Sequence, residues 1–127
     1  MSVETTPAEH ATELAEALGT TITEMDAYQT FTEAKAAVEA DEEAQEQIRE
    51  FERIREDFML ARQSGDATND DLRELQAAQQ ELHELPVMTA YLRAQSEVER
   101  KLQELNHAIS EPLVVDFGEK AGSCCQD

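Results

Sequence analysis

The sequence predicts an all-α protein, an antiparallel bundle of about five amphipathic helices with an irregular C-terminal tail. Apolar residues recur three and four positions apart along most of the chain, which is the spacing of one helical face. Turn-forming residues interrupt this pattern at only a few points. No sustained alternation of β-branched residues precedes Leu113, so strands are not expected. We place the helical domain at residues 1–109 and a flexible tail with glycines and cysteines at 110–127.

The first helix is expected to begin at Pro7, because the first helical position tolerates a residue without a backbone N–H. Its apolar face runs from Ala11 to Met25 in steps of three and four residues. Gly19 lies inside this pattern and costs about 1 kcal/mol relative to alanine in a helix. We expect the helix to continue through it.

Two aspartates are predicted to cap the next two helices. Asp26 precedes the second periodic segment and Asp41 precedes the third. An aspartate side chain in this position accepts a hydrogen bond from a free N–H of the first turn. The joint between these helices therefore falls near Ala40. The apolar positions of the third helix are Ala44, Ile48, Phe51, Ile54 and Phe58.

The clearest turn lies at residues 64–66, Ser-Gly-Asp. Thr68 followed by Asp71 resembles a capping box and marks the start of a fourth helix. Pro86 ends that helix and starts the fifth, because the residue before a proline avoids the helical conformation. The fifth helix has a heptad seam, made by Met88, Tyr91, Gln95, Val98, Leu102, Leu105 and Ile109. Each apolar stripe is narrow, so we expect a homodimer or a higher oligomer along one or more of these seams.

The charge of the chain excludes several partners. There are 29 acidic and 10 basic residues, a net charge of -19. The basic patch that nucleic acid or anionic lipid requires is missing, so no direct nucleic-acid or membrane binding is expected. An acidic chain with three lysines suits a salt-adapted, halophilic cytoplasm, and the alternative is an ordinary mesophilic acidic protein.

The compartment is expected to be the cytoplasm. The first fifteen residues lack the basic start and apolar run of a signal peptide. No stretch reaches the roughly 20 apolar residues of a membrane span. Two adjacent cysteines do not make the disulfide framework of a secreted protein, so both thiols are expected to be reduced.

Cys124 and Cys125 are the candidate cofactor and metal ligands. Two thiolates can bind a soft metal, yet zinc and iron–sulfur clusters usually take four ligands. A second copy of the chain or a partner protein could supply the other two. The alternatives are redox signalling and a C-terminus whose cysteines are incidental. Gly118 and Gly122 would let the tail wrap around a ligand.

The remaining polar residues give weaker indications. His107 could complete a site if the tail folds back, although an exposed histidine is the simpler interpretation, and His10 and His83 have no evident partner group. The acidic runs lie at predicted helix starts, where their charge interacts favourably with the helix dipole. We prefer this structural role to calcium binding, because the loop spacing of an EF-hand is absent. No nucleophile elbow, phosphate-binding loop or paired catalytic carboxylate is recognisable, so no catalytic residue is assigned.

Several short segments together carry a family resemblance. In the helical part they are Leu18-Gly19 with Ile22, Tyr28 with Phe31 and Ala34, residues 39–44, Phe51, Pro86-Val87 with Tyr91, and Ile109-Ser110-Glu111. In the tail they run from Asp116-Phe117-Gly118 to Cys124-Cys125-Gln126. With these segments the chain resembles the YlbF/YmcA family of small helical regulators, and the tail is similar to the YlbF branch of that family.

The resemblance implies a non-enzymatic regulator with an all-helical, self-associating fold. Bacterial members form a complex with a cysteine-rich protein that affects ribonuclease Y-dependent RNA maturation, competence, sporulation and biofilm formation. That complex carries iron–sulfur clusters, which makes Cys124 and Cys125 the implied cluster ligands. The acidity departs from the bacterial pattern and suggests a haloarchaeal relative, in which the ribonuclease partner need not exist.

The leading hypothesis is therefore a regulatory adaptor that binds itself and a regulatory protein partner. Its tail thiolates would hold an iron–sulfur cluster shared between chains or with that partner. The alternative is a purely structural scaffold or chaperone-like oligomer with an incidental tail. A thiol oxidoreductase fits less well, because such enzymes usually separate their cysteines as C-x-x-C.

Overall fold

The computed structural model describes residues 6–121, and these residues form six helices and no strand. The all-α prediction is therefore confirmed, with five substantial helices. Their bounds are α1 Pro7–Thr23, α2 Asp26–Ala40, α3 Glu42–Ser64, α4 Asn69–Glu84, α5 Pro86–Ser110 and α6 Phe117–Ala121. No helix within this part of the chain is both long and apolar enough to cross a bilayer.

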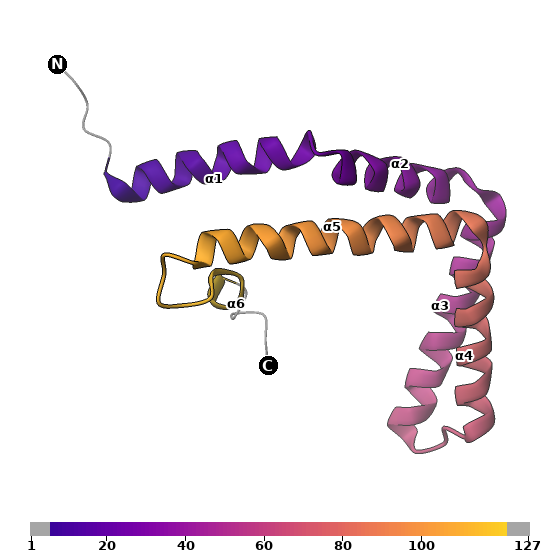
Figure 1. Cartoon of the computed structure of the whole chain (residues 1–127). Helices are drawn as coiled ribbons and strands as arrows, with labels where there is room; N and C mark the ends of the chain where they lie inside the picture. Colours follow the sequence, from indigo (N-terminus) through magenta and orange to yellow (C-terminus); the bar gives the residue numbers. More distant parts are fainter. Residues whose placement is uncertain (1–5, 122–127) are drawn as a thin grey trace.

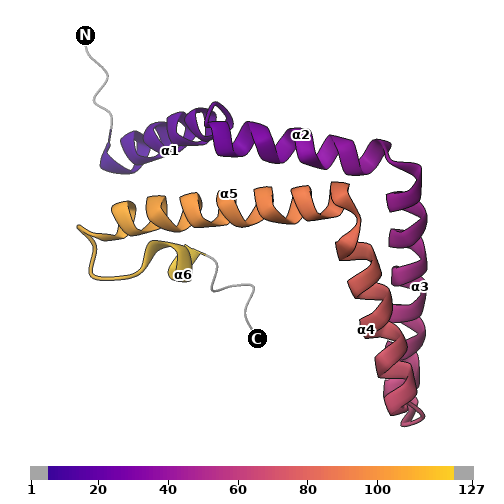
Figure 2. The same ribbon diagram turned by 45° about the vertical axis from the view of Figure 1, so that its right-hand side comes forward.

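The helices form two arms that meet at a corner (Figure 1). In one arm, α1 and α2 follow each other and α5 runs antiparallel beside them. In the other arm, α3 and α4 form an antiparallel hairpin that leaves the corner at a steep angle, as both ribbon views show (Figure 2). The closest packing is between α2 and α5 and between α3 and α4. In contrast, α1 makes few contacts, mainly with α2, and lies alongside the C-terminal half of α5.

The start of α1 follows the prediction, but the start of α2 does not. Pro7 is the first residue of α1, and the helix continues through Gly19. The predicted cap at Asp26 is wrong by one position, because Met25 is the capping residue and its side chain makes no capping bond. The N–H of Met25 already bonds the carbonyl of Ile22 at 3.1 Å, so the turn closes earlier. Asp26 instead places its charge in the first turn of α2, where the helix dipole favours it.

The other joints follow the local signals. The Asp41 side chain accepts a 2.8 Å hydrogen bond from the N–H of Ala44, which confirms the predicted cap of α3. Gly65 ends α3 with φ 80°, a conformation that disfavours residues with a Cβ. The capping box is complete: the Asp71 N–H bonds the Thr68 hydroxyl at 3.1 Å, and the Thr68 N–H bonds the Asp71 carboxylate at 3.0 Å.

The core lies at the corner between the two arms. Its centre consists of Val38, Ala44, Leu82 and Met88, with Ile48, Phe51, Leu85, Val87 and Tyr91 packed around them. Phe31 of α2 stacks on Tyr91 of α5 with ring centroids 5.4 Å apart, which extends this packing along the first arm. Only six residues are buried in the described chain. The arms therefore leave much apolar surface uncovered, as the narrow stripes predicted.

The beginning of the tail is more regular than expected. Residues 111–116 make a loop, and Phe117–Ala121 then forms the short helix α6, which packs against α5. Figure 1 places α6 beside the C-terminal end of α5. This arrangement brings the beginning of the tail back onto the open arm.

Candidate protein-docking site

An apolar groove lies between α1 and the C-terminal half of α5. It has a volume of about 470 Å³ beside α1, and a second, adjoining hollow continues it along α5. We call it the α1–α5 groove. Its apolar lining consists of Ala11, Leu14, Ala15, Leu18, Gly19 and Ile22 of α1, Leu102, Leu105 and Ile109 of α5, and Phe117 of α6.

The largest side chains of the groove are only partly covered. Leu14 is 57% exposed, Phe117 45% and Leu102 42%. Apolar surface left in water forgoes about 25 cal/mol per Å². Contiguous exposed apolar patches on soluble proteins commonly mark sites where another molecule binds. The groove is therefore the leading candidate for a docking site.

Three hydrogen bonds attach the start of the tail to α5, and a fourth lies within the tail. The N–H of Gly118 donates to Asn106 Oδ1 at 2.6 Å, and Asn106 Nδ2 donates to Asp116 Oδ1 at 3.3 Å. The N–H of Phe117 donates to Ser110 Oγ at 2.8 Å. In the fourth bond, which lies within the tail, Asp116 Oδ1 accepts from the N–H of Glu119 at 2.9 Å. We call this set the tail latch, and it holds Phe117 at the end of the groove.

The latch explains the residue types of the Asp116-Phe117-Gly118 motif. The N–H of Glu119 and, to a smaller extent, the amide of Asn106 stabilise the Asp116 carboxylate, so its pKa lies below the ordinary aspartate value. A Cβ on Gly118 would lie 2.8 Å from Asn106 Oδ1, which is too close for two non-bonded atoms. Aspartate thus caps α6, glycine allows the close approach and phenylalanine supplies apolar surface.

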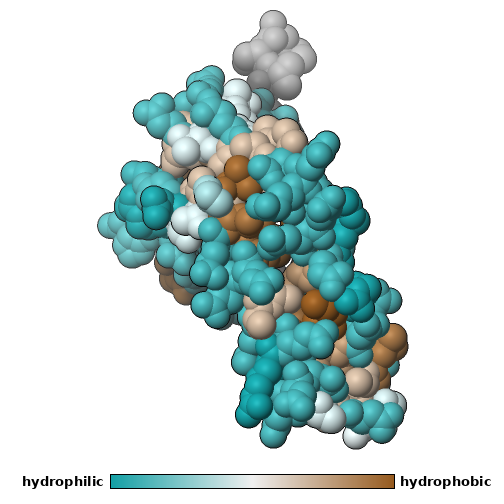
Figure 3. Space-filling view, turned by 90° about the vertical axis from the view of Figure 1, so that its right-hand side faces the viewer, coloured by the Kyte–Doolittle hydropathy of each residue, from teal (hydrophilic) through white to brown (hydrophobic). Residues whose placement is uncertain are grey.

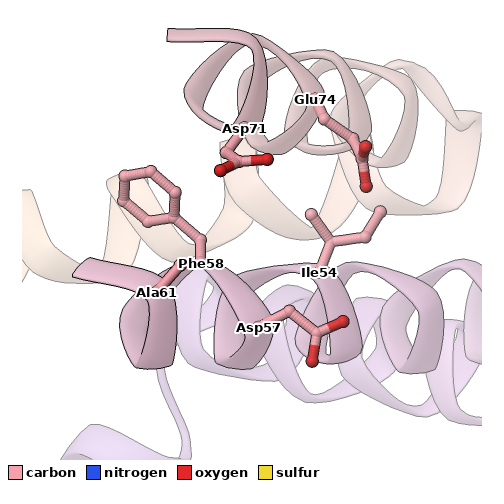
Figure 4. Close-up of a pocket in the computed structure, with 6 residues that line it drawn as sticks. All are labelled: Ile54, Asp57, Phe58, Ala61, Asp71 and Glu74. Carbon is pink, nitrogen blue, oxygen red and sulfur yellow. The ribbon is translucent and has the colours of Figure 1, made fainter. Parts of the chain in front are cut away.

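Another hollow, smaller than the α1–α5 groove, lies between α3 and α4 near the free end of the hairpin (Figure 4). Ile54 and Phe58 of α3 rise into the gap, where Asp71 and Glu74 of α4 face them. Asp71 belongs to the capping box, and Asp57 on the rim accepts a 3.1 Å hydrogen bond from Arg53. These two carboxylates therefore already have partners.

Apolar side chains are also exposed elsewhere on the hairpin, namely Met59 and Leu60 of α3 and Leu72 of α4. Seen from the side on which the hairpin lies, the surface is mainly hydrophilic, and apolar patches show through on both arms (Figure 3). We call Met59, Leu60 and Leu72 the hairpin surface. It is the second candidate contact site.

The predicted ligands lie outside this geometry. Cys124 and Cys125 fall outside the described residues. His107 is exposed in the last turn of α5 and His83 in the last turn of α4, while His10 lies 4.0 Å from Glu13 with both side chains exposed. Between residues 6 and 121, no three His, Cys, Asp or Glu side chains come together as a possible metal site.

The motif at residues 116–118 is recognisable in the sequence, but its docking on α5 is not. No role was predicted for Asn106, which makes two of the four latch bonds. The available signal was Asp116 directly before Phe117 and Gly118. An aspartate in this position can cap a helix by accepting a hydrogen bond from the N–H three residues later. That signal indicates a short capped helix, although it does not indicate where the helix docks.

Comparison with known proteins gives one match. A family model described as "Control of competence regulator ComK, YlbF/YmcA" matches residues 11–114. The matched region includes all of α2 to α5 and most of α1, so both walls of the groove lie within it. No curated protein and no solved structure matches the chain.

Proposed function

The chain belongs to the YlbF/YmcA family, and from this premise we propose that it is a non-enzymatic regulatory adaptor that binds other proteins. The family is one of regulators, which implies protein partners. The observation that carries the proposal is the α1–α5 groove, whose large apolar side chains are left partly exposed. A docked protein segment would remove this surface from water.

Protein docking suits the groove better than binding of a small molecule. Small-molecule pockets combine apolar walls with a few converging polar groups. The polar side chain of the groove lining is Asn106, and both ends of its amide are engaged in the tail latch. The surface therefore offers apolar contact over a long stretch without the polar groups that orient a small ligand.

An adaptor needs more than one contact, and the two arms offer two. We propose that one surface binds a regulatory protein partner and that another joins copies of this chain. The small core supports self-association, because an oligomer would bury apolar area that the monomer leaves exposed. The groove and the hairpin surface lie on different arms, so both could be occupied at once.

We further propose that Cys124 and Cys125 bind an iron–sulfur cluster. Each chain supplies two thiolates where such clusters usually take four. The donor set of one chain is thus half of a site, and a second chain or a cysteine-bearing partner would complete it. When bound, the cluster would make the tail sensitive to iron and to oxidation. We place this activity in the cytoplasm of a salt-adapted cell, where thiols stay reduced.

The adaptor proposal is tested by co-purification with two matched variants. Leu14→Asp changes an exposed residue of the groove, and Leu60→Asp changes an equally exposed residue of the hairpin surface. A protein recovered at constant stoichiometry with the wild type should be lost with one variant and kept with the other. Recovery of the same proteins with both variants and the wild type would contradict docking at either surface.

The cluster proposal is tested by anaerobic purification at high salt. The wild type should contain iron and sulfide, near one cluster for two chains if the tails pair with each other. A double variant with Cys124→Ser and Cys125→Ser should lose both while keeping its helical circular dichroism. Equal iron in the wild type and the double variant would contradict the assignment of these two ligands.

A further inference from the structure

We propose that the occupant of the α1–α5 groove is a basic amphipathic helix of a partner protein. This inference rests on the proposed function, since it names the chemistry of the partner at the same surface. Three observations carry it: the apolar hollow that the two helices line together, the arrangement of small and large residues on α1, and the negative charge of the segments that form the groove.

The space between the walls suits a helix. Packed helices lie about 8–10 Å apart, and α1 and α5 do not make the close contacts that α2 and α5 make farther along the same arm. Both walls repeat their apolar residues every three or four positions. A third helix laid along both walls would bury both stripes together, which is the helix-in-groove mode of recognition.

The surface of α1 has the relief that helix packing uses. Ala11, Ala15 and Gly19 follow one another at intervals of four, and so do Leu14, Leu18 and Ile22 beside them. Rows at this spacing are the ridges and furrows of an α-helix. The row of small residues is a furrow, and the space above Gly19 is open, because a Cβ built there meets no atom within 4 Å. A ridge of larger apolar side chains on the partner fits this furrow.

The charge of the segments that form the groove favours a cationic partner. Over all their faces, residues 7–23 and 97–121 contain nine carboxylates and three cationic side chains, Arg100, Lys101 and Lys120, whereas the groove lining itself is uncharged. Arg100 bonds Glu97 and also pairs with Glu104 at 3.3 Å, and Lys101 lies 3.8 Å from Glu104. The excess of negative charge would attract lysines and arginines that flank an apolar stripe. A second copy of the chain would bring a net charge of -19 to the same surface.

A designed peptide provides the probe. It has about 20 residues, which is about 30 Å of helix, with leucines every three or four positions and lysine or arginine on both flanks. One control peptide carries glutamate in place of every cation. A second control has the composition of the first peptide in an order that breaks the stripe. Binding of each labelled peptide to the full-length protein is measured by fluorescence anisotropy, with salt held constant.

The expected result is binding of the basic amphipathic peptide alone. Leu14→Asp and Leu102→Asp should each weaken it about tenfold or more, while Leu60→Asp on the hairpin surface should leave it unchanged. The added carboxylates sharpen this test, because they would strengthen a purely electrostatic contact. The three positions are exposed, so the variants should fold, and circular dichroism checks this.

Several results would overturn the inference. Equal binding of the acidic or the scrambled peptide would show that the stripe or its charged flanks do not matter. Equal weakening by Leu60→Asp would place the site elsewhere. If the groove variants halve the mass of the protein in light scattering, a second copy occupies the groove. If the basic peptide does not bind, the proposal of a basic helix is rejected. If a natural partner is nevertheless lost from the groove variants alone, the adaptor function still stands.

Discussion

The backbone N–H of Gly118 lies 2.6 Å from Oδ1 of Asn106, although the two residues are twelve positions apart in the chain. The same Asn106 side chain donates to Asp116, the residue that caps α6. One asparagine on α5 thus bonds both the first turn of α6 and its cap. Through these bonds it places Phe117 at the end of the α1–α5 groove.

Replacing Asn106 by alanine should release α6 from α5. The change removes two hydrogen bonds, each worth about 1 kcal/mol in a folded protein. The amide of Gly118 should exchange with solvent about tenfold faster, whereas amides in α3 and α4 keep their rates. Gln103→Ala is the control, since Gln103 is exposed on the same helix and takes no part in the four latch bonds. Equal acceleration in both variants would show that the latch does not hold α6.

Two glycines should respond in opposite directions to alanine. Gly118→Ala places a Cβ 2.8 Å from Asn106 Oδ1, so the Asn106 side chain must shift and its hydrogen bond to the residue 118 N–H should weaken. Gly19→Ala meets no atom within 4 Å and should stabilise α1 by up to about 1 kcal/mol through helix propensity. Hydrogen exchange in α6 and the helical signal of circular dichroism report the two effects. A Gly118→Ala protein with wild-type exchange throughout α6 would disprove the close contact.

The latch should weaken in acid. The Asp116 pKa is lowered in the folded protein by hydrogen bonds from the Glu119 N–H and Asn106. A lowered folded pKa means that the stabilisation is complete above the unfolded value, about 3.9, and disappears as the pH falls through the lower folded value. The Glu119 amide shift should therefore titrate at a pH below that of an ordinary aspartate. In Asp116→Asn this transition should vanish, and its survival there would assign it to another group.

Added sodium chloride should stabilise the protein. The net charge of -19 makes repulsion a large cost of the compact state, and the Debye length falls from about 10 Å at 0.1 M to about 3 Å at 1 M. The melting temperature should rise across this range. Replacing Glu9, Glu13 and Glu16 by glutamine should reduce the rise, because it removes three of the repelling charges. An unchanged salt response in that triple variant would contradict a repulsive origin.

Local signals in the sequence located most of the helix boundaries. Asp41, Gly65 and the pair Thr68 and Asp71 each act within three or four residues, so their geometry follows from the sequence alone. Asp26 is an exception, because the helix cap lies one residue before it, at Met25. The bond from the Met25 N–H to the Ile22 carbonyl closes the turn one residue earlier than the aspartate indicated.

The docking site depends on contacts that periodicity does not encode. The heptad seam of α5 was visible as one continuous stripe, yet Met88 is buried in the core while Leu102 is 42% exposed in the groove. The difference arises because α2 covers the first half of α5 and α1 stands away from the second half. Likewise, nothing local links Asn106 to Gly118. The candidate ligands Cys124 and Cys125 remain a prediction.

The most direct measurement is hydrogen exchange of the full-length protein with and without the basic amphipathic peptide. Docking in the α1–α5 groove should slow exchange in residues 11–22 and 102–109, because a third helix would hold both walls. The hairpin α3–α4 should keep its rates, which makes it an internal control. Protection confined to the hairpin, or spread evenly over the chain, would contradict the claim that the groove is the docking site.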